Sequence, residues 1–192
     1  MDNVSFHGLE LETARGRVMT PRPTSERLVD AALALASDRH MRVADVGTGS
    51  GAVAAAVAIA LPRAKVVATD TCTAAVRLAR ANVSRLGLAD RVTVVHGNLL
   101  DPVAGPVDLV VANLPYLPAG DASRHPELMA EPKSAIFADG DGFGPYRELV
   151  AASRGRLTED GALAIQLPGR IVTARRDNLD ALAAMLAVRA AA

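Results

Sequence analysis

Apolar residues along this chain follow two alternating spacings, which predict strands and helices in turn. Short runs rich in valine, leucine and alanine are typical of strands covered on both faces. Between these runs, apolar residues recur every three or four positions, as on the buried face of a helix. The predicted strands are residues 42–46, 65–69, 92–95, 109–112 and 162–167. The predicted helices run from Thr24 or Ser25 to before Arg39, from Gly51 to Leu61, and over residues 73–86, 145–157 and 173–187.

Five strands that alternate with helices predict an α/β fold with a doubly wound, mostly parallel sheet. Parallel neighbours need crossover connections, and these are right-handed in nearly all proteins. Helices then cover both faces of the sheet. We expect the strand order 3-2-1-4-5.

The first twenty residues predict a short β-hairpin ahead of this fold. Apolar and polar residues alternate over 6–12 and again over 17–20, on either side of a turn at residues 14–16. Pro21-Arg22-Pro23 then forces an extended link. Since 192 residues suit one domain with a real core, we expect a hairpin extension over residues 1–20 and a single domain over residues 21–192.

Composition argues against several classes of partner. Lys+Arg and Asp+Glu are equal at 21 each and aromatic residues make up 3%, so neither a basic field nor stacking platforms favour nucleic acid. The chain has one cysteine and begins Met1-Asp2, which predicts a cytoplasmic protein without a signal peptide. No apolar run is long enough to span a membrane. The four histidines lack metal-ligand spacing, so we expect no metal.

The turn after the first predicted strand, residues 47–51 (GTGSG), is a candidate binding site. Its glycines let backbone N–H groups approach a ligand, and the helix N-terminus behind them favours polar or anionic groups. About twenty residues further on, Asp70 ends the second strand, where an acid can accept both hydroxyls of a ribose. Together they predict an adenosine-containing cofactor. The alternative is that Gly47 only forms a tight turn and that Asp70 only caps the next helix.

The fourth predicted strand runs directly into Asn113-Leu114-Pro115-Tyr116. Pro115 ends the strand, so Asn113 lies at the carboxyl end of the sheet, where doubly wound folds bind ligands. A plain proline turn is the alternative interpretation. Asn98, after the third strand, could bond an adenine edge. Residues 117–144 show no clear period, and so long a loop usually has a binding function.

Residues 45–51 (DVGTGSG) and 113–116 (NLPY) resemble the HemK/PrmC family of S-adenosylmethionine-dependent protein glutamine-N5 methyltransferases. Residues 21–26, Glu131-Pro132 and residues 141–147 resemble further segments of that family. The chain departs from the family at Leu114, usually proline, at Asn98, often an acid, and at Gln166, usually glutamate. We also expect a short form without the N-terminal helical domain of the family and without two strands that normally follow the fifth.

The resemblance implies a Rossmann-like class I methyltransferase domain and a site in two parts. It implies that the Asn113 side-chain oxygen and the Leu114 carbonyl accept the two N–H bonds of a planar amide, with Pro115 rigid beside them and Tyr116 packed on the amide. The acceptor would be a protein glutamine, in a peptide chain release factor. S-adenosyl-L-methionine would be bound by Asp45, Gly47, Thr48, Gly49, Gly51, Asp70, Asn98 and Asn113.

Two other functions stay open at this point. The exocyclic amine of adenine is also a planar NH2 group, so an N6-adenine methyltransferase acting on RNA or DNA would need a similar clamp. The neutral charge and the few aromatic residues argue against it. A cofactor-binding module without catalysis is the third hypothesis, since strands are expected to be missing from the C-terminal side.

Overall fold

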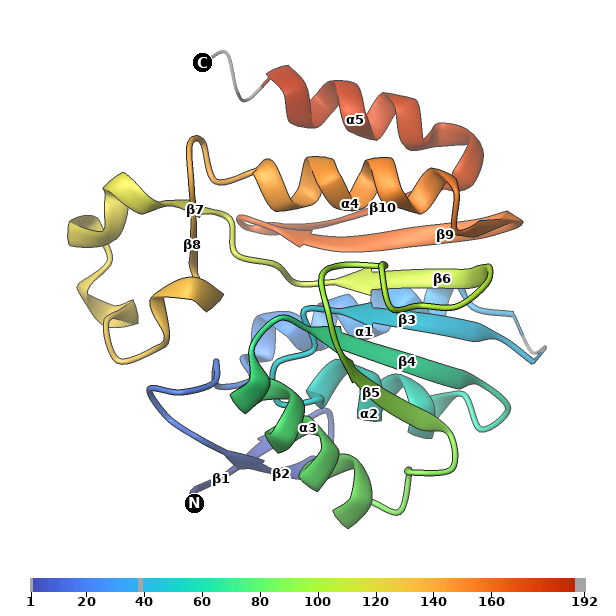
Figure 1. The fold of residues 1–192 in the computed structure, drawn as a ribbon, viewed down its shortest axis with the longest axis horizontal. Coiled ribbons are helices and arrows are strands. Elements are labelled where there is room, and N and C mark those ends of the chain that lie inside the picture. Colours follow the sequence, from blue (N-terminus) through green and yellow to red (C-terminus); the bar gives the residue numbers. More distant parts are fainter. Residues whose placement is uncertain (1, 38–39, 189–192) are drawn as a thin grey trace.

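The computed structural model describes residues 2–37 and 40–188, and places helices on both faces of a central sheet (Figure 1). The sheet has the order β10-β9-β6-β3-β4-β5. Counted over the five predicted strands alone, this order is 3-2-1-4-5, which confirms the prediction. The predicted hairpin extension (residues 1–20) and domain (residues 21–192) include residues 1, 38–39 and 189–192, which lie outside the described residues. The strands are β3 (Arg42–Val46), β4 (Lys65–Asp70), β5 (Val92–His96), β6 (Val107–Ala112), β9 (Leu157–Leu167) and β10 (Arg170–Arg175).

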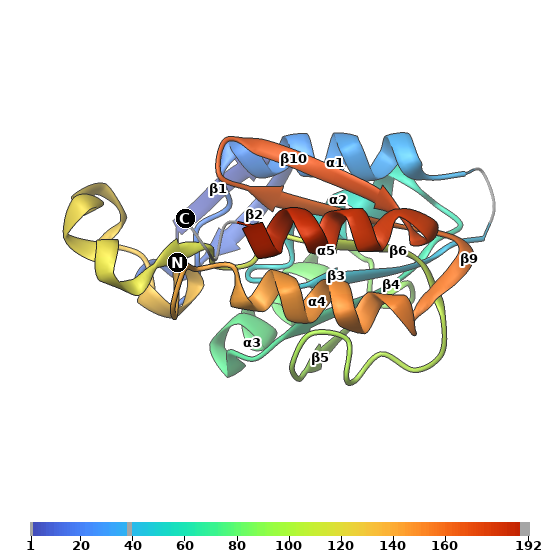
Figure 2. The same ribbon diagram turned by 90° about the horizontal axis from the view of Figure 1, so that it is seen from above.

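The two faces of the sheet carry separate layers of apolar side chains. In β6, Leu109 and Val111 join the layer on one face, whereas Val110 and Ala112 join the other. The first layer packs under α1, α2 and α3, and the second under α4 and α5; Figure 2 shows α1 and α4 on opposite sides of the strands. Burial on both faces explains the valine-rich runs of the sequence. The helices are α1 (Pro23–Leu35), α2 (Ala52–Ala60), α3 (Thr73–Arg85), α4 (Gly144–Arg154) and α5 (Leu179–Val188).

The N-terminal hairpin exists, but its pairing differs from the predicted one. Strands β1 (Asp2–Phe6) and β2 (Leu9–Thr13) pair antiparallel around a turn at His7 and Gly8, which have φ angles of 49° and 76°. The predicted partner strand, residues 17–20, is instead part of an irregular linker, residues 14–22. The register follows the core, because Phe6 and Leu11 are both fully buried in the layer beneath α1.

The start of α1 also differs from the prediction. The helix begins at Pro23, with Arg22 as the N-cap residue and no side-chain cap. Proline fits the first turn because its missing N–H has no helical partner there. Ser25 is therefore inside the helix, where its side chain is buried and free to serve another segment.

We expected both strands after the fifth to be missing, but the described residues contain one of them, β10. Gly169, with φ of 72°, lets the chain reverse after β9, so that Arg170 pairs with Leu167 and β10 runs antiparallel at the sheet edge. The predicted helix start at residue 173 was therefore wrong, and α5 begins at Leu179. Helix α4 ends at Arg154, before the predicted 157, because β9 already begins at Leu157.

An insertion, residues 117–143, projects beyond the carboxyl end of the sheet, in yellow to orange in Figure 1. It contains the 3-10 helices Ala119–Arg124, Pro126–Leu128 and Lys133–Ala135 and the parallel pair β7 (Leu117–Pro118) and β8 (Phe137–Ala138). The backbone N–H groups of Tyr116 and Leu117 donate to the Ile136 carbonyl at 3.2 and 3.1 Å. The insertion is thus closed on itself where it leaves β6. Among the described residues, no helix is long and apolar enough to cross a membrane.

The side chain of Asn82 in α3 joins the hairpin to the glycine turn. It is fully buried, accepts the N–H of Glu12 at 2.9 Å, and donates to the carbonyls of Glu12 at 3.1 Å and Ser50 at 2.9 Å. One amide therefore satisfies three backbone groups that β2 and the turn leave unpaired.

We expect Asn82→Ala to lower the free energy of unfolding by roughly 2 to 4 kcal/mol, because it leaves buried backbone groups without partners. Chemical denaturation followed by circular dichroism measures this change. Ser84→Ala, at an exposed position of the same helix, is the control and should change stability by less than about 0.5 kcal/mol. Equal effects of the two substitutions would contradict the bridging role of Asn82.

Candidate functional site

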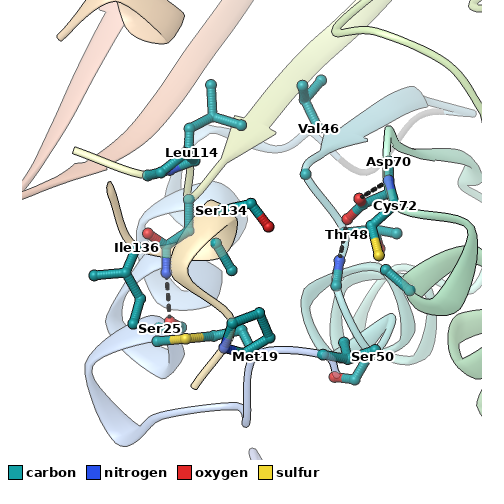
Figure 3. Close-up of a pocket in the computed structure, with 18 of the residues that line it drawn as sticks. Met19, Ser25, Val46, Thr48, Ser50, Asp70, Cys72, Leu114, Ser134 and Ile136 are labelled. Atoms are coloured by element: carbon teal, nitrogen blue, oxygen red, sulfur yellow. Dashed lines mark hydrogen bonds between the residues drawn. The ribbon is translucent and has the colours of Figure 1, made fainter. Parts of the chain in front are cut away.

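A cavity of about 360 Å³ lies at the carboxyl end of the parallel strands (Figure 3). One wall is formed by the glycine turn after β3, the end of β4 and residues 97–99. The opposite wall is formed by the linker, the first turn of α1 and the insertion. In Figure 3, Thr48 and Asp70 lie on the first side and Ser25 and Ile136 on the other. The cavity is thus bounded by segments that are far apart in the sequence.

Most of the predicted site residues line this cavity. Two of them, Asp45 and Gly51, are not in its wall. Asp45 lies beneath the turn, and Gly51 packs against α3, where an added Cβ would be 3.2 Å from the Ala79 Cα. Both therefore support the cavity wall instead of forming it. The predicted residues that line the cavity are Gly47, Thr48, Gly49, Asp70, Asn98, Asn113, Leu114, Pro115 and Tyr116.

The glycine turn needs glycine for two separate reasons. Gly47 and Gly49 have φ angles of 74° and 57°, in the left-handed region that costs other residues free energy. An added Cβ at Gly47 would also lie 2.7 Å from the Leu114 Cδ2. At Gly49, in contrast, an added Cβ would meet nothing within 4 Å. The turn is therefore packed tightly at its base and open toward the cavity at Gly49.

Asp70 is held in place by two backbone N–H groups. Its Oδ2 accepts from Gly49 at 2.9 Å, and its Oδ1 accepts from Cys72 at 2.8 Å. A carboxylate has about four acceptor positions, so both oxygens keep capacity for a ligand. Asp70 thus offers fixed acceptors at the cavity wall next to the open part of the glycine turn.

Asp45 is buried and joins β3 to the turn and to α2. Its Oδ2 accepts the Thr48 hydroxyl at 2.6 Å and the Ala54 N–H at 3.1 Å. Burial raises the pKa of Asp45 to about 6, and these two hydrogen bonds only partly oppose that rise. Asp45 therefore shapes the turn from below and has no contact with the cavity.

Asn113 continues β6 into the cavity, and Ser25 of α1 fixes its orientation. The Asn113 Nδ2 donates to the Ser25 Oγ at 3.0 Å. The carbonyl oxygen of the Asn113 side chain is then the end left to accept hydrogen bonds. Sequence reasoning assigned Ser25 only to a helix cap, because nothing local shows that it would face Asn113, 88 residues away.

Tyr146 of α4 holds the backbone of Leu114. Its hydroxyl is fully buried, accepts the Leu114 N–H at 2.9 Å, and lies 3.0 Å from the Leu114 carbonyl and 2.5 Å from the Gln166 carbonyl. A hydroxyl has one hydrogen to donate, and the nearer acceptor is Gln166. The Leu114 carbonyl therefore keeps acceptor capacity. Burial raises the pKa of Tyr146, so the hydroxyl stays protonated.

Comparisons with known proteins agree with this geometry. A family model described as "Methyltransferase small domain" matches residues 25–143. The chain is 41% identical over 169 residues to the release factor glutamine methyltransferase of Deinococcus radiodurans, covering 87% of this chain and 60% of that protein. It is 42% identical over 154 residues to the protein of the same name from Gloeobacter violaceus, covering 78% and 54%. The chain thus spans little more than half the length of these relatives.

Solved structures with a similar fold include methyltransferases. The crystal structure of a ribosomal protein L11 methylase from Lactobacillus delbrueckii subsp. bulgaricus matches with a TM-score of 0.55 at 25% identity, covering 76% of this chain and 61% of that one. The precorrin-6y C5,15-methyltransferase of Geobacter metallireducens GS-15 matches with a TM-score of 0.59 at 16% identity, covering 92% and 74%. The second likeness concerns the fold alone. These findings confirm the predicted resemblance and the Rossmann-like fold.

Asp45 should give the stability of the protein a specific pH dependence. Since the pKa of Asp45 rises from 3.8 to about 6 on folding, its contribution is fully present below pH 3.8 and is lost as the pH rises through about 6. Asp45→Asn cannot titrate. We expect the free energy of unfolding of the variant, minus that of the wild type, to rise by roughly 2 kcal/mol between about pH 4 and pH 7.

Denaturant titrations at several pH values measure this difference. Asp101→Asn, at an exposed position, makes the same chemical change away from the core and is the matched control. A flat curve for Asp45→Asn would show that the carboxyl group is already ionised in the folded protein near pH 4.

Proposed function

Because this chain belongs to the methyltransferase small domain family, we propose that it transfers a methyl group from S-adenosylmethionine to a planar amide NH2. The observation that carries this proposal is the contact between the two halves of the cavity. The glycine turn and the Asn113-Leu114 segment touch at Gly47 and Leu114. A cofactor on the turn and an amide at Asn113 would therefore be neighbours in one cavity.

The residues on the first wall fit an adenosine-containing methyl donor. Their cavity, at about 360 Å³, has the size of a small-molecule site. Asp70 would accept the ribose hydroxyls, the open backbone at Gly49 would approach the ligand, and Asn98 would lie at the adenine edge. When bound, S-adenosylmethionine supplies a methyl group on a positively charged sulfur.

The residues that follow β6 fit the acceptor. An amide nitrogen is a weak nucleophile because its lone pair is delocalised into the carbonyl group. Two N–H bonds donated to the Asn113 Oδ1 and the Leu114 carbonyl would orient the nitrogen and make it more electron-rich. Ser25 and Tyr146 hold these acceptors in place. No strong base is needed, since the nitrogen can lose its proton after the transfer.

We infer that the acceptor is a protein glutamine, in a release factor. The support is the similarity to release factor glutamine methyltransferases at 41% and 42% identity, together with the fixed positions of Asn113 and the Leu114 backbone, which could accept from an amide. Zero net charge and 3% aromatic residues give no support to a nucleic acid acceptor.

Transfer of a labelled methyl group into a cell extract, followed by separation of protein from nucleic acid, tests the class of acceptor. We expect the label in protein, and in purified release factor when this is the only acceptor. Label in nucleic acid alone would refute the proposed function, and binding of the cofactor without any transfer would indicate a module without catalysis.

Asn113→Ala removes one of the two acceptors in the clamp. We expect turnover to fall by roughly a hundredfold or more, as happens when one preorganised hydrogen-bonding group is lost elsewhere. Single-turnover transfer to release factor measures this, with cofactor affinity measured in parallel by calorimetry. Asn178→Ala, at an exposed position, is the control. Near-normal turnover of Asn113→Ala with intact cofactor binding would exclude the clamp.

Asp70→Asn keeps the size of the side chain but removes its charge. We expect the dissociation constant for S-adenosylmethionine to increase about tenfold or more, because hydrogen bonds to a charged acceptor contribute roughly 1.5 to 3 kcal/mol. Calorimetric titration measures this value. The KM for the acceptor should stay close to that of the wild type, and an unchanged cofactor affinity would argue against a ribose at Asp70.

A further inference from the structure

Three buried side-chain atoms have no hydrogen-bond partner within the described part of the chain. They are the Thr20 Oγ1, the Arg22 Nε and the Gln166 Oε1. All three residues line the same cavity, on the side of the linker and α1. Buried polar atoms are nearly always paired in native proteins. Their concentration on one wall indicates that a ligand supplies the missing partners.

Thr20 and Arg22 are held in position by the insertion. The Thr20 N–H donates to the Glu131 Oε2 at 3.1 Å, and the Arg22 Nη2 lies 3.8 Å from the Glu131 Oε1. The Glu131 side chain is only 11% exposed. The linker and the insertion are therefore joined at this wall, and the unpaired atoms belong to a fixed surface.

Gln166 lies beside Asn113 at the carboxyl end of the sheet. Ala112 of β6 pairs with Ile165 of β9, so the residues that follow them, Asn113 and Gln166, are neighbours. Both amides donate to hydroxyls in the first turn of α1: Asn113 to Ser25 at 3.0 Å and Gln166 to Thr24 at 3.4 Å. In each case the carbonyl oxygen is the free end.

The chemistry of the three atoms fits a peptide main chain. The Arg22 Nε can only donate, the Gln166 Oε1 can only accept, and the Thr20 hydroxyl can do either. An extended peptide presents C=O and N–H groups in alternation. A phosphodiester offers acceptors only, which would leave Gln166 unpaired. The carboxylate of Glu131 next to Arg22 also disfavours an anion there.

We propose that Thr20, Arg22 and Gln166 form a subsite for the main chain of the protein segment that carries the acceptor amide. The subsite lies next to the clamp formed by Asn113 and Leu114, and the inference rests on the proposed function. These three residues then determine affinity for the acceptor, whereas the opposite wall determines affinity for the cofactor.

The test uses Thr20→Val, Arg22→Met and Gln166→Leu in the full chain, with purified release factor as the acceptor. We expect the KM for the acceptor to increase about tenfold for Arg22→Met and Gln166→Leu, and severalfold for Thr20→Val. The turnover number and the dissociation constant for S-adenosylmethionine should stay within about twofold of the wild type. Thr20→Val keeps the backbone bond to Glu131, so it reports on the hydroxyl alone.

Arg27→Met is the matched control, because Arg27 is exposed on α1 and the substitution removes the same charge. An unchanged KM in all three variants, with active transfer into release factor, would overturn the subsite and leave the proposed function intact. An equal KM increase for Arg27→Met that disappears at high salt would also overturn it, since it would indicate general attraction of an anion.

The wild-type result separates the inference from the function on which it rests. Label in other extract proteins but not in release factor would refute only the assignment of release factor as the acceptor. The variants would then be compared by the label that they transfer into those other proteins. A deficit in the three variants, but not in Arg27→Met, would support the subsite there. Label only in nucleic acid, or in nothing, would overturn both proposals.

Discussion

The site depends on how closely the backbone of the glycine turn approaches the end of β6. Glycine is favoured at Gly47 because its φ of 74° is left-handed and because an added Cβ would lie 2.7 Å from the Leu114 Cδ2, which would then have to shift. That contact fixes the separation between the wall proposed for the cofactor and the wall proposed for the acceptor. The two walls are neighbours because two parallel strands in register, β3 and β6, end at the same level.

Parallel packing also explains why one face of the sheet carries the polar groups. Alternation along β6 and β9 directs Asn113 and Gln166 toward α1, while Leu114 enters the apolar layer under α4. Tyr146 satisfies the Leu114 backbone from that second layer. Ser25 thus orients the Asn113 side chain from one face of the sheet, and the buried Tyr146 hydroxyl holds the Leu114 backbone from the other.

Local patterns in the sequence were enough to predict the strand order, the glycine turn and the segment after β6. Valine-rich runs and glycine spacing reflect burial and backbone conformation within a few residues. The roles of Ser25 and Tyr146 depend on contacts across 88 and 32 residues, which no local pattern records. The hairpin register and β10 were missed for a similar reason. Burial of Phe6 and Leu11 sets the hairpin register, and the chain reversal at Gly169 starts β10.

The N-terminal hairpin is mechanically part of the site, although it contributes only one side chain, Phe6, to the cavity wall. The side-chain amide of Asn82 bonds both to the backbone of Glu12 in β2 and to the backbone of Ser50 in the glycine turn. Displacement of β2 would therefore break or pull on hydrogen bonds of the same amide that holds the turn. Docking of the hairpin on the outside of the domain therefore helps to hold the Ser50 carbonyl, and with it the start of α2, in place.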